Sequence, residues 1–176
     1  ERGGLTRSWN KGLTVAKNRN LDYCICGNND IVFTHRWYEG MLHALENGYD
    51  LVGPLSNAPG DQDAALVDKY VKGYIKNDDT SEINEIAYKV RKQYAGQVVE
   101  SEINGFFLLA SMQSWIKGMY NKELFFRAYN THTSKGRRNP TPSMTLNENE
   151  LQARWLKLDM KACVSLSSFI FHYRSC

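Results

Sequence analysis

Apolar residues along the chain alternate between the spacing of amphipathic helices and that of buried strands. Helical spacing is found in three segments, residues 6–18, 34–48 and 147–158. Short apolar runs typical of strands are residues 21–27, 49–56 and 103–111, followed by two closing runs within 161–176. Helices that alternate with strands in this way predict an α/β layer structure with a mostly parallel sheet.

The middle of the chain, residues 61–97, is polar and follows a helical pattern. Two helices are predicted there, at 64–75 and 81–94, separated by Asn77-Asp78-Asp79-Thr80. We interpret this stretch as a helical insertion over one edge of the sheet, inside a single domain that spans residues 1–176. Its charges suit a solvated helix face, and a mobile lid over a site is the alternative.

The amino-acid composition indicates a globular protein. The 176 residues are 42% hydrophobic and carry a formal net charge of +3, which suits one globular domain and gives no reason to expect a nucleic-acid partner. No run of about 18 apolar residues is present, so no transmembrane segment is predicted. The densest basic cluster, Lys135, Arg137 and Arg138, suits either a solvated loop or a loop that binds a phosphate or an acceptor.

Four cysteines indicate the redox environment. Cys24 and Cys26 alternate along a predicted strand, so they share one buried face and do not form a C-x-x-C site. Cys163 is expected to be a third buried thiol, and Cys176 is terminal. Reduced structural cysteines favour a cytoplasmic location, and peripheral attachment to a membrane is compatible with it.

The strand at 21–27 stops abruptly at Asn28-Asn29-Asp30. In parallel α/β sheets, ligands bind outside the carboxyl ends of the strands. Mg²⁺ and Mn²⁺ prefer oxygen ligands and are often bound by only one or two protein carboxylates together with substrate phosphates. Asp30 therefore suits a metal bound to a diphosphate. The alternative is a turn in which these side chains satisfy backbone N–H groups.

The order of five motifs resembles family 2 glycosyltransferases of the GT-A fold. Asn10-Lys11-Gly12 resembles the family's N-x-G helix start, and Asn28-Asn29-Asp30 resembles its DXD-like motif after a strand. Three later segments resemble a glycine-containing strand (INGFFLLAS, 103–111), an acidic helix start of the form E-D-x-D-L-x-x-R (NENELQAR, 147–154) and a closing strand with a histidine (SSFIFHY, 167–173). Together they cover most of the chain.

The resemblance implies a GT-A-like, three-layer α/β/α fold with helices on both faces of the sheet. It also implies inverting transfer of a sugar from a UDP- or GDP-sugar donor to a hydroxyl of a glycan or other acceptor. A Mn²⁺ or Mg²⁺ ion held by Asp30 would stabilise the diphosphate leaving group. His172 is the second implied metal ligand, although a histidine at the end of an aromatic strand is also a common packing residue. Donor contacts are implied for Asn10, Asn28, Asn29, Asp30 and Gly105.

The resemblance places Glu148 where the family has its catalytic Asp. An inverting transferase needs a carboxylate that accepts the proton of the attacking hydroxyl. The extra methylene of Glu shifts that carboxylate by roughly an ångström, which a displaced backbone can absorb. Glu148 and Glu150 equally suit the start of a helix, where the dipole favours acidic residues.

Family members have further strands ahead of the N-x-G element, so the expected fold is abbreviated at its N-terminus. Either the chain is a fragment, or a second chain supplies those strands in an oligomer, or the fold is rebuilt. An alternative function is a catalytically inactive glycosyltransferase-like module that binds a nucleotide or glycan. A nucleotide-sugar pyrophosphorylase or another α/β phosphate-binding domain is less favoured, because no glycine-rich phosphate loop is found in the sequence.

Overall fold

The computed structural model describes residues 5–57, 80–127 and 147–173. The helices are α1 (Leu5–Asn18), α2 (Glu39–Glu46), α4 (Thr80–Gln93), α5 (Met112–Lys117) and α6 (Asn147–Leu156). The strands are β1 (Tyr23–Gly27), β2 (Ile31–Phe33), β3 (Leu51–Leu55), β4 (Val98–Glu100), β5 (Phe107–Ser111) and β6 (Ala162–His172). The helix expected at 64–75, the basic cluster at 135–138 and Cys176 lie outside the described residues.

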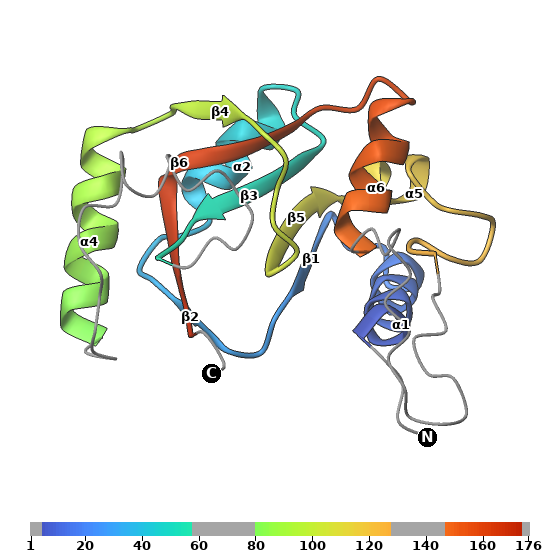
Figure 1. The fold of residues 1–176 in the computed structure, drawn as a ribbon, viewed down its shortest axis with the longest axis horizontal. Coiled ribbons are helices and arrows are strands. Elements are labelled where there is room, and N and C mark those ends of the chain that lie inside the picture. The colour runs from blue at the N-terminus through green and yellow to red at the C-terminus, as the bar shows by residue number, and fades with distance from the viewer. Residues whose placement is uncertain (1–4, 58–79, 128–146, 174–176) are drawn as a thin grey trace, which may run out of the picture.

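The strands form a curled sheet of mixed direction (Figure 1). Their order is β1-β5-β3-β6-β2, and β4 also pairs with β6. β3 and β6 run parallel, whereas β5 pairs antiparallel with β1 and β3, and β6 pairs antiparallel with β2 and β4. The α/β class is confirmed, but the expectation of a mostly parallel sheet is wrong. The reason is that β5 enters between β1 and β3 in the opposite direction, and apolar spacing carries no information about strand direction.

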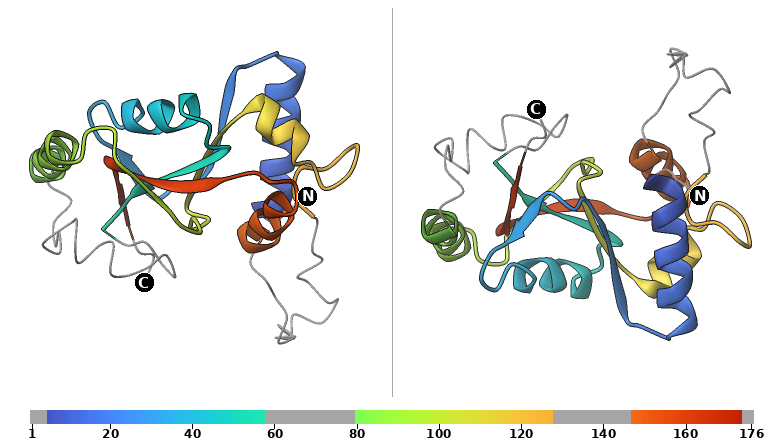
Figure 2. Two further views of the ribbon diagram at one scale, coloured as in Figure 1. Left: turned by 90° about the horizontal axis from the view of Figure 1, so that it is seen from above. Right: turned by 90° about the horizontal axis from the view of Figure 1, so that it is seen from below.

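Helices pack against both faces of the sheet, as β5 illustrates. Its residues Leu108 and Ala110 pack with residues of α1, α5 and α6, while Phe107 and Leu109 pack with residues of α2 on the other face. Figure 2 shows α4 at the opposite end of the molecule from α1, α5 and α6. No helix within the described ranges is long and apolar enough to cross a membrane.

The closing segment forms one strand of 11 residues, β6, where two short runs were expected. The pairing of β6 with β3 shifts between Pro54 and Leu55, which lie opposite Ser165 and Phe169 respectively. The serines in this irregular stretch lie against Gly40 of α2, where a Cβ would clash with their hydroxyl oxygens. A glycine at this position therefore lets α2 approach the sheet closely. Beyond the irregularity, β6 turns to pair with β2 (Figure 1).

Helix α2 starts later than its apolar pattern predicts and ends where predicted. Arg36 has a φ of 58°, which is incompatible with a right-handed helix, so α2 begins only at Glu39. Asn47 caps the C-terminal end, and Gly48 follows with a φ of 91°. A glycine adopts this left-handed conformation without steric cost, which explains why the helical segment predicted over 34–48 ends here.

The three described cysteines are free thiols, of which Cys26 and Cys163 are buried and Cys24 is partly buried. Cys24 and Cys26 belong to the same hydrophobic cluster, which confirms that they share one face of β1. Burial raises the pKa of Cys26 well above that of an exposed thiol, and burial raises the pKa of Cys163 to about 12. Both thiols are therefore protonated at neutral pH and act as packing residues.

Candidate functional site

One edge of the sheet gathers the ends of several strands. β1, β3 and β6 run in the same direction, because β1 and β3 are both antiparallel to β5 and β3 is parallel to β6. Their carboxyl ends therefore lie at the same edge as the start of β5. Asn28 follows β1, Asn57 follows β3, His172 ends β6, and Phe106 precedes β5. This edge is the candidate site.

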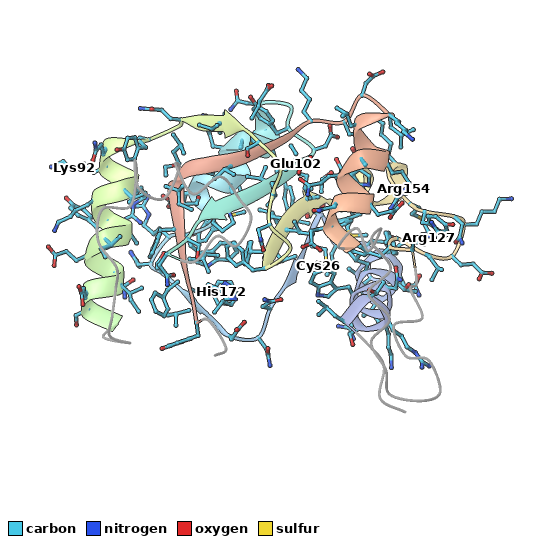
Figure 3. All side chains as sticks on the ribbon, viewed as in Figure 1. Cys26, Lys92, Glu102, Arg127, Arg154 and His172 are labelled. Atoms are coloured by element: carbon cyan, nitrogen blue, oxygen red, sulfur yellow. The ribbon has the colours of Figure 1, made fainter. Side chains whose placement is uncertain are left out.

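Asp30 and His172 are far apart in the sequence and meet at this edge. Asp30 Oδ1 lies 3.3 Å from His172 Nε2, and Asn28 Nδ2 lies 3.4 Å from the same ring nitrogen. Figure 3 shows His172 at the end of β6, beside the loop between β1 and β2. The side chains of Asp30 and His172 are only partly exposed, at 29% and 15%. Two of the predicted donor-site residues, Asn28 and Asp30, thus surround the imidazole.

The backbone of His172 is fixed on both sides. Asn57 Oδ1 accepts a hydrogen bond from His172 N–H at 2.8 Å, and Asn57 Nδ2 donates to the His172 carbonyl oxygen at 3.1 Å. The next residue, Tyr173, donates its N–H to the carbonyl oxygen of Asp30 at 2.8 Å. The ring of Phe106 stacks on the imidazole with centroids 4.9 Å apart and planes 13° from parallel. The imidazole is thus held at a defined place next to Asp30.

The Asp30–His172 pair fits two neighbouring ligands of a divalent metal ion. Ligand atoms about 2.1 Å from an octahedral ion lie about 3 Å apart when they are adjacent, close to the 3.3 Å between Oδ1 and Nε2. A carboxylate and a neutral imidazole suit Mn²⁺, and carboxylate and phosphate oxygens suit Mg²⁺. Within the described residues, no group of three His, Cys, Asp or Glu side chains could hold a metal ion. Further ligands would have to come from water and from the phosphates of a substrate.

Glu148 lies over Gly105, the residue that precedes Phe106 in the chain. A Cβ built on Gly105 would be 2.5 Å from the carboxyl carbon of Glu148. Gly105 is in a turn, because Asn104 Oδ1 accepts a hydrogen bond from Phe106 N–H at 3.2 Å. The strand expected from residue 103 therefore begins only at Phe107. Only a residue without a side chain allows the carboxylate of Glu148 to take this position.

The two acidic residues in the first turn of α6 have different partners. Glu150 Oε1 lies 3.0 Å from Nε of Arg154, one helical turn later. Arg154 also donates to the carbonyl oxygens of Gly118 and Phe125. Among the described residues, no hydrogen bond or ion pair to the Glu148 carboxylate is found. Glu150 is therefore a structural residue, whereas Glu148 has no such fixed partner within the described ranges.

Asn10 lies in the protein interior, inside α1 and not at a helix start. Its Oδ1 accepts from the N–H groups of Phe125 and Phe126, both at 2.8 Å, and its Nδ2 donates to the Phe126 carbonyl oxygen at 2.9 Å. Asn10 is 6% exposed, and its side chain ties α1 to this segment. We therefore leave Asn10 out of the candidate site. Asn29 is exposed between Asn28 and Asp30, and it stays a candidate donor contact.

A separate pocket of about 340 Å³ lies between α6 and the chain that follows β4. Its lining includes Leu51, Glu102 and Trp155. Neither Asp30, His172 nor Glu148 lines it, so the pocket is distinct from the strand-end site.

Sequence reasoning missed two residues that shape the site. Asn57 is the polar residue that follows the strand run 49–56, so its place after a buried strand was the available signal. Phe106 was included in a predicted strand, and nothing in its apolar neighbourhood distinguished a ring that stacks on His172 from an ordinary core residue.

The chain was compared with known proteins at the level of families, sequences and folds. It matches no protein-family model, no curated protein and no solved structure.

Proposed function

We propose that the chain is a metal-dependent glycosyltransferase of the GT-A type, which moves a sugar from a nucleotide-sugar donor to an acceptor hydroxyl with inversion. The observation that carries the proposal is the contact between Asp30 and His172 at the strand-end edge that also holds Glu148. Two side chains that can bind a metal and a carboxylate that bonds to no other described residue are the groups that this reaction requires.

Asp30 and His172 would hold the divalent cation through Oδ1 and Nε2. The metal would supply Lewis-acid stabilisation of the negative charge that develops on the leaving diphosphate. Asn28 Nδ2 lies 3.4 Å from the same ring nitrogen, so its amide suits a contact to an oxygen of the ribose or the diphosphate. The stack of Phe106 on His172 keeps the imidazole from turning away from Asp30.

Glu148 would act as the general base. Its carboxylate takes the proton of the acceptor hydroxyl while the hydroxyl oxygen forms a bond to the anomeric carbon of the donor. The bond between that carbon and the diphosphate breaks on the opposite side, so the configuration of the sugar inverts. The absence of a side chain at Gly105 lets the Glu148 carboxylate lie directly against the backbone there.

The test is a calorimetric titration of UDP- and GDP-sugars into the protein, with and without Mn²⁺. We expect binding that requires Mn²⁺ and that falls at least 100-fold in Asp30→Ala. The matched control is Asp22→Ala, which removes an exposed carboxylate at the other end of β1. Equal donor affinity in wild type and Asp30→Ala would refute the metal assignment.

A second candidate function is a binding module without catalysis. Its support is that only two metal-ligating side chains, Asp30 and His172, come together in the described part of the chain. Asn28 also stands where the resemblance implies an acidic residue. This candidate predicts metal-dependent binding of a nucleotide sugar without turnover, whereas the transferase releases a nucleoside diphosphate when an acceptor is present.

A further inference from the structure

Gln152 joins α6 to the segment that carries Gly105. Its Oε1 accepts the N–H of Ile103 at 2.7 Å, and its Nε2 donates to the carbonyl oxygen of Ile103 at 2.9 Å. The same Nε2 lies 3.3 Å from the backbone carbonyl oxygen of Glu148. One side-chain amide thus satisfies both backbone groups of one residue, as a neighbouring strand would.

This amide pair is buried. Gln152 is 8% exposed and Ile103 is 2% exposed. Ile103 is also fixed through its side chain, which fills the space beside Gly53, where a Cβ would clash with it. Buried backbone groups need hydrogen-bond partners, and Ile103 lies outside the strands. The position of Ile103 relative to α6 therefore depends on Gln152.

Gln152 lies one helical turn after Glu148, and Gly105 lies two residues after Ile103. Residues four apart lie on the same face of a helix, so Gln152 and Glu148 face the same segment. The pairing of Gln152 with Ile103 therefore fixes the distance between α6 and this segment, and with it the contact between Glu148 and Gly105.

We propose that Gln152 is a positioning residue for the transfer reaction and sets the distance from the Glu148 carboxylate to the reacting groups above Gly105. The inference rests on the proposed function. A misplacement of about 1 Å costs on the order of 100-fold in rate when geometry limits proton transfer. Loss of the amide pair therefore lowers the rate of transfer and leaves the donor contacts at Asp30 and His172 unchanged.

The test uses the full chain and two variants of Gln152. Gln152→Met keeps the size of the side chain and removes both hydrogen bonds to Ile103. Its expected kcat, per folded molecule, is 10- to 100-fold below wild type, with a donor KM within twofold. The folded fraction is measured by circular dichroism and by the stoichiometry of donor binding. The control is Gln93→Met, at an exposed position on α4, with wild-type kcat and KM expected.

Gln152→Glu keeps the inference testable if Gln152→Met does not fold. Its carboxylate still accepts from Ile103 N–H, and only its protonated form also donates to the carbonyl oxygen. The rate of this variant relative to wild type is therefore expected to rise as the pH is lowered.

The outcomes separate this inference from the proposed function. An unchanged kcat per folded Gln152→Met molecule, or a kcat that falls only in proportion to donor affinity, overturns the positioning role while the transferase stands. The positioning role is also contradicted if the transfer rate of Gln152→Glu, divided by that of wild type, does not change with pH. A wild-type protein that turns over none of the UDP- and GDP-sugars refutes the proposed function, and the inference with it.

Discussion

Two side-chain amides, those of Asn57 and Gln152, hold the two halves of the candidate site in the same way. Asn57 pairs with both backbone groups of His172 in the half that would bind the metal. Gln152 pairs with both backbone groups of Ile103 in the half that carries Glu148. The contacts are alike, but the surroundings differ. His172 is also held within β6, whereas Ile103 belongs to no strand.

The position of Glu148 therefore depends more on one side-chain amide than the position of His172 does. Pairing of β6 with β2, together with the bond from Tyr173 N–H to Asp30, keeps His172 beside Asp30 even without Asn57. The Glu148 half has no such second support from a strand ladder. We therefore expect substitutions to disturb the placement of the base more readily than the placement of the metal ligands.

The largest expected effect comes from the base itself. Glu148→Gln keeps the shape of the side chain but cannot accept a proton, so transfer is expected to fall by about 10²- to 10⁴-fold with donor affinity unchanged. The control is Glu150→Gln on the same helical turn, whose carboxylate pairs with Arg154 and faces no substrate in this account. Transfer rates measured at saturating donor compare the two. Equal losses in both variants would remove Glu148 from the reaction.

A smaller effect is expected when the space above residue 105 is filled. Gly105→Ala adds a Cβ at the place occupied by the Glu148 carboxyl group, which has to move by about 1 Å. Transfer is expected to fall by roughly 10- to 100-fold, while the metal half keeps its affinity for the donor. Gly12→Ala is the matched control, because no atom lies within 4 Å of its added Cβ. A Gly105→Ala enzyme with wild-type kcat would contradict the placement of the base.

Asn57→Ala tests the half of the site that a strand supports. It removes two hydrogen bonds from His172 and leaves the β2–β6 pairing in place. The affinity for Mn²⁺ in the presence of donor is expected to fall by roughly 10-fold, as for other groups that orient a metal ligand. Asn18→Ala, at the exposed end of α1, serves as the control. A loss of metal affinity as large as in His172→Ala would show that strand pairing does not hold the imidazole.

The last prediction concerns stability, not transfer, and tests the strand framework of the metal half. Burial raises the pKa of Cys163 in β6 to about 12, against 9.0 for an ordinary thiol. The folded state therefore binds this proton more tightly than the unfolded state. Its stabilising effect is complete below about pH 9 and is lost as the pH rises toward 12, at about 1.4 kcal/mol per pH unit. Urea unfolding of wild type and Cys163→Ala from pH 8 to 11 measures it, and parallel pH profiles would argue against a buried thiol.

The sequence allows the local elements to be predicted better than their arrangement. Apolar spacing located α1, α4 and α6 within one or two residues, because each helix has one buried face. The predicted direction of the strands was wrong, because β5 lies between β1 and β3 and runs antiparallel to both. Those neighbours are set by tertiary packing, which the spacing of apolar residues does not record.

The same limit applies to the candidate site. Asp30 was selected as a metal ligand from its position after a strand and His172 from the resemblance to a family motif, and the fold brings the two side chains together. Asn57 and Gln152 were not selected, because a buried amide that pairs with a distant backbone looks in sequence like any other polar residue. Asn10 was predicted to contact the donor because of the N-x-G motif, but its side chain hydrogen-bonds to the backbone of Phe125 and Phe126 inside the protein.

Release of nucleoside diphosphate from UDP- and GDP-sugars, measured with a set of hydroxyl acceptors and Mn²⁺, decides whether the protein is a transferase. We expect release that requires both metal and acceptor in wild type, and none above background in Glu148→Gln, even though that variant binds the donor. Release at the same rate in both proteins, or metal-dependent donor binding without release in wild type, would contradict this expectation.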